Sequence, residues 1–128
     1  MANQATVLVV DDNDMMRKLL VAELGADPAL RVEQAASARE GLKIAEETHC
    51  SVIVLDMILP DMDGLKFIER LREVRPDSPS VIVITGTSAV AVPDGIIEGP
   101  YRGMVSAVFR KPFDHAKLRE TVRFCAGV

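Results

Sequence analysis

The sequence has few of the residues on which disulfide-linked or zinc-stabilised domains depend. Its 128 residues include only two cysteines, Cys50 and Cys125, and these form no Cys-x-x-Cys pair. Each cysteine borders an apolar run, so we expect two inert, buried thiols and neither a disulfide framework nor a zinc site.

Features of membrane, secreted and strongly basic proteins are also missing. No apolar stretch approaches the roughly 20 residues that a helix needs to cross a bilayer. The first residues, MANQATVLVV, lack the basic start and small-residue cleavage site of a signal peptide. The formal net charge of −4 argues against nucleic-acid binding through bulk charge. We therefore expect a cytoplasmic protein with no direct nucleic-acid or membrane partner.

The composition is that of one ordinary globular domain. Apolar residues make up 48% of the chain and charged residues 27%, both close to the usual values for globular proteins. A chain of this length can bury a core of its own, and it contains no repeats or linkers. We expect a single domain over residues 1–128.

Apolar runs alternate with segments of helical periodicity. The expected strands are residues 6–10, 31–35, 50–55, 80–84 and 107–109. The expected helices are residues 14–24, 37–48, from 63 or 64 to before 76, and from the cap at 114 through 125. Strands that are apolar throughout and alternate with helices predict an α/β fold, in which helices cover both faces of a parallel sheet.

One segment does not fit this alternation. A helix is expected between residues 84 and 107, yet this stretch contains Pro93, Gly95, Gly99, Pro100 and Gly103. Proline costs about 3 kcal/mol in a helix interior and glycine about 1 kcal/mol. We therefore expect an irregular fourth helix that is short, weak or displaced.

Polar residues follow the predicted strands. They are Asp11 and Asp12 after the first strand, Asp56 after the third, Thr85 after the fourth and Lys111 after the fifth. In an open parallel sheet the carboxyl ends of the strands share one edge, where ligands bind. Three carboxylates at that edge repel one another and need a cation. Oxygen ligands without histidine or cysteine favour Mg²⁺, with Mn²⁺ as a second candidate.

The same groups fit transfer of a phosphoryl group to a carboxylate. Asp56 is the candidate nucleophile, the metal ion neutralises the moving charge, and Thr85 and Lys111 contact the phosphoryl oxygens. Taken singly, an Asp-Asp pair is more often a helix cap, a threonine a turn residue and a lysine a solvated charge. Their combination, in the expected chain order, favours the phosphoryl site.

Four motifs identify a family resemblance: VLVVDDND, VLDMILPDMDG, VIVITG and FRKPF. Through them the chain resembles, over nearly its full length, the receiver domain of two-component response regulators. The resemblance implies a doubly wound (βα)5 flavodoxin-like fold with a five-stranded parallel sheet in the order 2-1-3-4-5.

The resemblance also implies a role for each acidic residue. Asp56 is the phosphoacceptor and takes a phosphoryl group from a histidine kinase or a histidine phosphotransfer protein. Asp12 binds Mg²⁺ directly and Asp11 assists through water. Asp56 and the backbone carbonyl of Met57 complete the protein ligands of the metal.

The resemblance also implies which residues change the conformation of the domain after phosphorylation. Thr85 is the hydroxyl that moves toward the phosphoryl group, Lys111 pairs with that group, and Lys111–Pro112 is a cis peptide. Such a domain catalyses its own phosphorylation and dephosphorylation but is a signalling switch rather than a metabolic enzyme.

The sequence departs from the family pattern at the switch aromatic. Many receivers have an aromatic residue three positions before the lysine, whereas this chain has Val108 there and Phe109 next to it. Side chains alternate along a strand, so we expect Phe109 to belong to the core. Tyr101 is another substitute, and the irregular segment 93–103 stands where the family has a helical output surface.

Three further residues carry expectations about signal lifetime and docking. Ile58 and Thr87 lie two positions after the phosphoacceptor and the switch threonine, where family members flank the path of the hydrolytic water. Neither side chain has the reach of a long polar group, so slow dephosphorylation is expected. Met15 falls off the apolar face of its helix, so we expect it to be exposed and to contact the phosphate donor.

Two alternatives stay open. A pseudo-receiver would keep the fold as a binding module without phosphorylation. A receiver either acts alone on a downstream protein target or controls an output domain that these 128 residues do not include.

Overall fold

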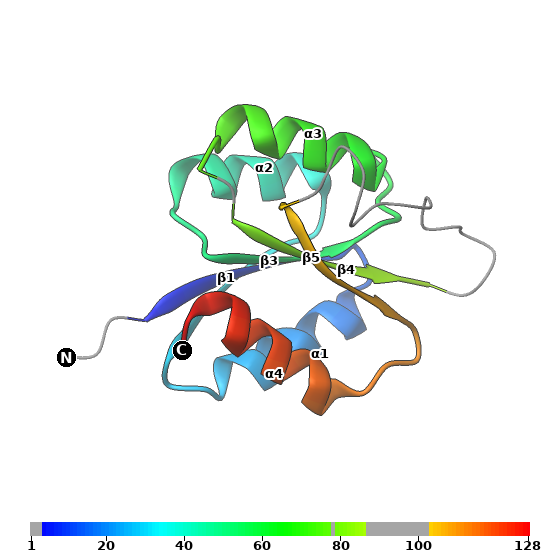
Figure 1. The fold of residues 1–128 in the computed structure, drawn as a ribbon. Helices are drawn as coiled ribbons and strands as arrows, with labels where there is room; N and C mark the ends of the chain where they lie inside the picture. The colour runs from blue at the N-terminus through cyan, green and yellow to red at the C-terminus, as the bar shows by residue number, and fades with distance from the viewer. Residues whose placement is uncertain (1–3, 78, 87–102) are drawn as a thin grey trace.

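The computed structural model describes residues 4–77, 79–86 and 103–128 (Figure 1). A five-stranded sheet runs through its centre in the order β2-β1-β3-β4-β5, and every neighbouring pair of strands is parallel. The strands are β1 (Ala5–Val10), β2 (Leu30–Ala35), β3 (Val52–Asp56), β4 (Ser80–Thr85) and β5 (Val105–Arg110). The predicted strand order is confirmed.

Helices cover both faces of the sheet. They are α1 (Asp14–Gly25), α2 (Ala38–Glu47), α3 (Gly64–Val74) and α4 (His115–Ala126). Figure 1 shows α2 and α3 on one face and α1 and α4 on the other, which is the doubly wound arrangement. The expected irregular helix falls within residues 87–102, outside the described residues. No helix in the described part of the chain is both long and apolar enough to span a membrane.

Two hydrophobic clusters, one on each face of the sheet, explain why the central strands are apolar throughout. Leu8 and Ile53 point into the cluster that includes Phe67 of α3. Val7 and Val52 point into the cluster that includes Leu20 of α1. Because successive side chains alternate between the faces, a strand covered on both sides must be apolar at every position.

Side-chain caps begin each helix shortly after a strand ends. Asn13 accepts a hydrogen bond from the Met16 amide at the start of α1. Ser37 and Asp63 accept amide hydrogen bonds at the starts of α2 and α3, and the predicted cap Asp114 does so at the start of α4. These caps satisfy free amides of the first turn, so the polar ends of β1, β3 and β5 remain in short loops at one edge of the sheet.

The side chains of Val108 and Phe109 lie on opposite faces, as strand alternation predicts. Val108 packs against the cluster under α2 and α3, and Phe109 packs against the cluster under α1 and α4. The Phe109 ring also meets Phe113 edge-on, with 6.0 Å between the ring centroids. Phe109 is therefore partly buried against the core on that face, and Tyr101 lies outside the described residues.

A close backbone approach fixes the loop that follows β3. A Cβ atom on Gly64 would lie 2.6 Å from the Met57 sulfur and 2.9 Å from both the Cα and the carbonyl oxygen of Met57. The sulfur can move aside, but the backbone atoms cannot move without shifting the loop. Glycine at this position therefore allows α3 to begin directly against the residue after Asp56.

We expect Gly64→Ala to lower the free energy of unfolding by about 1–3 kcal/mol, because the added methyl group overlaps the Met57 backbone. Urea denaturation measures this change. The matched control is Gly25→Ala, since a Cβ atom on Gly25 meets no atom within 4 Å. Equal midpoints for the two variants would contradict the steric explanation.

Candidate functional site

The polar strand ends meet at the carboxyl edge of the sheet. Carboxylate oxygens of Asp11, Asp12 and Asp56 lie within 4.8 Å of one another. The Nζ atom of Lys111 lies 3.7 Å from Oδ2 of Asp56. The structure thus brings together the acids that follow β1 and end β3 with the lysine that follows β5, and the parallel register of the sheet is the reason.

Asp56 is 7% exposed, and few polar groups among the described residues face its buried carboxylate. Its Oδ1 accepts a hydrogen bond from the Ile58 amide at 3.0 Å, while its Oδ2 faces Lys111. The Lys111 amide in turn donates to the Thr85 carbonyl at 2.9 Å, and the Lys111–Pro112 peptide is cis, as expected. The backbone of the β5–α4 loop therefore places a positive charge opposite the carboxylate.

Two buried oxygens at this edge have no hydrogen-bond partner within the described part of the chain: Oδ2 of Asp11 and Oγ of Thr85. Burying a polar atom without a partner costs about 1–3 kcal/mol. Asp11 is 1% exposed and Thr85 is fully buried. These two atoms mark positions at which a bound ligand would replace the missing contact.

Burial raises the pKa of Asp11 to about 6, and the nearby charge of Asp56 adds to the rise. The Asn13 amide, which donates to Oδ1 of Asp11 at 2.8 Å, opposes the rise, and so does the charge of Lys111. The raised pKa shows that the surroundings of Asp11 disfavour a negative charge on its carboxyl group. A cation bound to this cluster would reverse that balance.

The acid cluster fits a hard divalent cation. It offers carboxylate oxygens only, one of them buried and unpartnered, and Asp12 is exposed where it can exchange water for an ion. The Met57 carbonyl already accepts a hydrogen bond from the Gly64 amide at 3.2 Å, which leaves one lone pair for a metal. Its part in metal binding stays a prediction.

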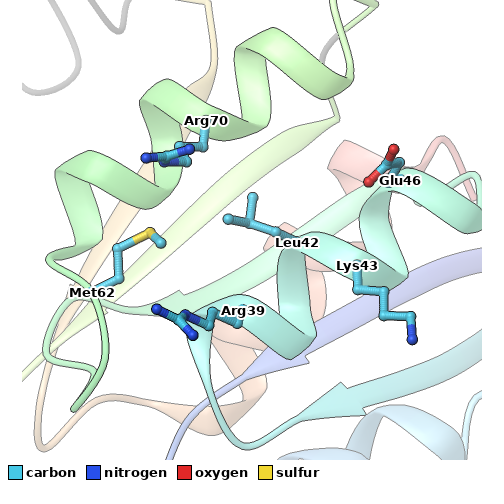
Figure 2. Close-up of a pocket in the computed structure, with 6 residues that line it drawn as sticks. All are labelled: Arg39, Leu42, Lys43, Glu46, Met62 and Arg70. Atoms are coloured by element: carbon cyan, nitrogen blue, oxygen red, sulfur yellow. The ribbon is translucent and has the colours of Figure 1, made fainter.

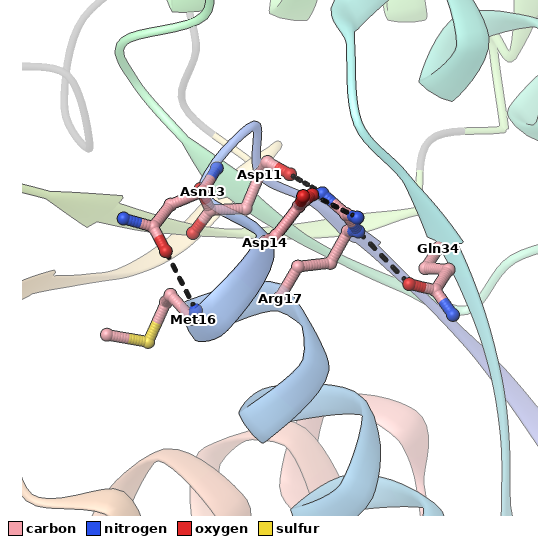
Figure 3. Close-up of polar contacts among 6 residues, drawn as sticks. All are labelled: Asp11, Asn13, Asp14, Met16, Arg17 and Gln34. Atoms are coloured by element: carbon pink, nitrogen blue, oxygen red, sulfur yellow. Dashed lines mark hydrogen bonds and ion pairs between the residues drawn. The ribbon is translucent and has the colours of Figure 1, made fainter.

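Arg17 is a site residue that the sequence did not reveal (Figure 3). Its guanidinium donates to the Asp11 carbonyl at 2.9 Å and to Oε1 of Gln34 at 3.0 Å, and it pairs with Asp14 at 2.6 Å. The side chain is only 11% exposed. Arg17 therefore ties the loop that carries Asp11 and Asp12 to β2. In the sequence, the three-residue spacing between Asp14 and Arg17 indicates their ion pair. It gives no indication of the contacts of Arg17 with Asp11 and Gln34.

Asp61 is a second residue whose role the sequence did not reveal. From the loop after β3 it accepts hydrogen bonds from the Ala38 amide at 2.9 Å and the Arg39 amide at 3.0 Å. These two N–H groups hold the pKa of Asp61 below its usual range. Asp61 thus fastens the loop that follows Asp56 to the start of α2.

The residues expected to control lifetime and docking lie at the surface where they are described. Ile58 is 49% exposed and Met15 is 84% exposed, whereas Met16 packs against the core. Thr87 lies outside the described residues. The roles of Ile58, Thr87 and Met15 stay predictions.

We expect Arg17→Ala to weaken Mg²⁺ binding about fivefold to tenfold, because charged hydrogen bonds that hold the ligand loop are lost. Arg17→Lys should recover only part of the affinity, since an ammonium cannot contact three acceptors in the fork geometry. Isothermal titration calorimetry with Mg²⁺ measures the change. The control is Arg31→Ala, which removes an exposed ion pair with Glu33 on β2. Unchanged affinity in Arg17→Ala would contradict the positioning role.

Comparison with known proteins agrees with this geometry. The family described as response regulator receiver domain matches residues 7–123. A protein-glutamate methylesterase/protein-glutamine glutaminase of Rhizobium etli is 40% identical over 88 residues, which cover 68% of this chain and 25% of that protein. A protein of the same description from Dechloromonas aromatica is 44% identical over 87 residues, which cover 65% of this chain and 24% of that protein. The match spans about a quarter of the length of these relatives.

Solved structures share the whole fold. A CheY-like response regulator receiver domain protein from Methanospirillum hungatei superposes with a TM-score of 0.84 at 25% identity, covering 98% of this chain and 95% of the other. A response regulator receiver protein from Pseudomonas putida gives 0.81 at 27% identity, covering 97% and 99%.

Proposed function

Since the chain belongs to the family of response regulator receiver domains, we propose that Asp56 accepts a phosphoryl group in a Mg²⁺-dependent reaction. The observation that supports this most is the arrangement around Asp56. Lys111 faces one carboxylate oxygen at 3.7 Å, and unpartnered oxygens of Asp11 and Thr85 lie at the same edge of the sheet. Each group matches a need of phosphoryl transfer.

The two oxygens of Asp56 have different surroundings, which suggests how the reaction proceeds. The Ile58 amide holds Oδ1, so Oδ2 is the oxygen that attacks phosphorus. A bond forms between Oδ2 and phosphorus as the bond between phosphorus and the donor breaks, and the donor leaves with that electron pair. Lys111 then pairs with the phosphoryl oxygens in place of the free carboxylate.

Asp11, Asp12 and Asp56 would hold the metal ion, with the Met57 carbonyl as a further candidate ligand. Bound there, Mg²⁺ supplies positive charge to the transferring oxygens. Thr85 donates its hydroxyl to a phosphoryl oxygen and gains the hydrogen bond that it lacks in the described structure. That gain favours a shift of the end of β4 when Asp56 is phosphorylated, which is the proposed switch.

The proposed donors are a histidine kinase or a histidine phosphotransfer protein, with Met15 on the exposed side of α1 as a contact. The proposed recipient of the signal is a downstream protein or an output domain. The curated relatives are methylesterase/glutaminase proteins about four times the matched length, so an attached enzyme domain is one form that such an output would take.

Incubation with acetyl phosphate and Mg²⁺, followed by intact mass measurement, tests the proposal. We expect one phosphoryl adduct on the unmodified protein and none after chelation of Mg²⁺. Asp56→Asn should abolish the adduct, because an amide is not a usable nucleophile. Asp63→Asn is the matched control, since Asp63 caps α3 with its side chain and asparagine caps equally well.

A protein that keeps its fold but forms no adduct would be a pseudo-receiver, and the proposal would be wrong. An adduct that persists in Asp56→Asn would place the phosphoryl group on another residue. Both results are read from the same mass spectra.

A further inference from the structure

An open groove runs between α2 and α3, with a volume of about 350 Å³. Four of its lining residues come from α2, one from the loop before α3 and one from α3. They are Arg39, Leu42, Lys43, Glu46, Met62 and Arg70 (Figure 2). None of them belongs to the phosphoryl site, so this groove needs an explanation of its own.

The walls of the groove carry a local excess of positive charge. Arg39, Lys43 and Arg70 line it together with a single acid, Glu46, although the whole chain has a net charge of −4. Within residues 4–77, 79–86 and 103–128, the guanidinium groups of Arg39 and Arg70 make no hydrogen bond and no ion pair within 4.0 Å. The charge of Arg39 does act on the nearby Asp61 carboxylate and helps to hold the pKa of Asp61 low. The planar donor sets of both guanidinium groups are nevertheless available to pair with carboxylates of a ligand.

The floor of the groove is apolar. Leu42 and Met62 are partly buried and pack against the hydrophobic cluster beneath α2 and α3. Figure 2 shows Leu42 pointing into the space that Arg39, Arg70 and Met62 surround. A ligand that fits must therefore combine negative charge with a bulky apolar group, which a simple inorganic anion does not.

The groove is also held in shape without a ligand. Asp61 accepts the amide hydrogens of Ala38 and Arg39, and this anchors the loop that supplies Met62. The same contacts occupy the N-terminal amides of α2 with the protein's own carboxylate. An incoming anion would therefore pair with side chains rather than with the helix end, and little ordering would be needed on binding.

We propose that the α2–α3 groove docks an acidic segment of a partner protein. Carboxylates of the segment pair with Arg39 and Arg70, and a leucine-sized side chain between them packs on Leu42 and Met62. Glu46 disfavours negative charge at its end of the groove, so it sets the direction of the segment. The described residues that line the groove include no aromatic side chain on which a base could stack, which favours a protein segment over a single-stranded nucleic acid.

The first test uses a short fluorescein-labelled peptide with glutamates on both sides of a leucine, and the same peptide with glutamines. Fluorescence anisotropy should show the glutamate peptide binding at least about tenfold more tightly, with an affinity that falls as salt rises. Backbone amide shifts in nuclear magnetic resonance spectra should centre on Arg39, Leu42 and Met62. Equal affinities for the two peptides, or no shifts at the groove, would overturn the proposal.

Charge reversal provides the second test. The variant Arg39→Glu with Arg70→Glu should lose about tenfold or more in affinity for the glutamate peptide, because both pairing groups become repulsive. Glutamate is compatible with the first turn of α2, and circular dichroism checks the fold. If the double variant unfolds, Arg39→Gln with Arg70→Gln replaces it, with the same direction expected.

The control variant is Lys18→Glu with Lys117→Glu, which changes the net charge equally at exposed positions of α1 and α4, on the opposite face of the sheet from the groove. It should keep its affinity within about twofold, since distant exposed charges are screened. Equal losses of peptide affinity in the two double variants would show that net charge alone explains the effect, and this would overturn the proposal. Tighter groove binding of a single-stranded DNA oligonucleotide than of the peptide would overturn it in favour of nucleic acid.

Discussion

Repulsion between carboxylates at the edge of the sheet is the constraint on which the rest of the site depends. Asp11 and Asp56 are both buried there, Asp12 lies beside them, and Lys111 faces Asp56. Charged groups with so little water around them need a cation nearby. Oδ2 of Asp11 has no hydrogen-bond partner among the described residues, so the groups described there leave this need partly unmet.

The surrounding loops keep the carboxylates close in spite of that repulsion. Arg17 fixes the loop after β1 to β2 through the Asp11 carbonyl and Gln34. Asp61 fixes the loop after β3 to α2, and the contact between Gly64 and Met57 sets where α3 begins. Rigid strands with short, tied loops are the usual way to hold a reactive group in one geometry. The same Asp61 contacts shape the α2–α3 groove, so the two surfaces share one loop.

Local sequence patterns predicted most of the fold because they report burial directly. Strands covered on both faces must be apolar throughout, and residues 6–10 and 80–84 coincide with β1 and β4 to within one residue. The predicted ends of the strands were less accurate. The third strand was expected from residue 50 but begins at Val52, and β5 extends beyond 107–109 to Val105 and Arg110.

The site was predictable in part for a related reason. Polar residues at strand ends are visible in sequence, and parallel topology brings them together. The contacts of Arg17 with Gln34 and of Asp61 with Ala38 join residues 17 and 23 positions apart, so no local periodicity encodes them. The α2–α3 groove likewise depends on how two helices pack, which single-helix patterns do not specify.

The most direct test of the central claim is thermal unfolding as a function of Mg²⁺ concentration, for the unmodified protein and for Asp12→Asn. If the carboxylate cluster is a metal site, Mg²⁺ raises the Tm of the unmodified protein progressively, because the ion binds the folded state alone. Asp12→Asn, which changes an exposed side chain, should unfold at a similar or higher Tm without metal and lose most of the response. A Tm that does not respond to Mg²⁺, or that rises equally in both proteins, would contradict the account.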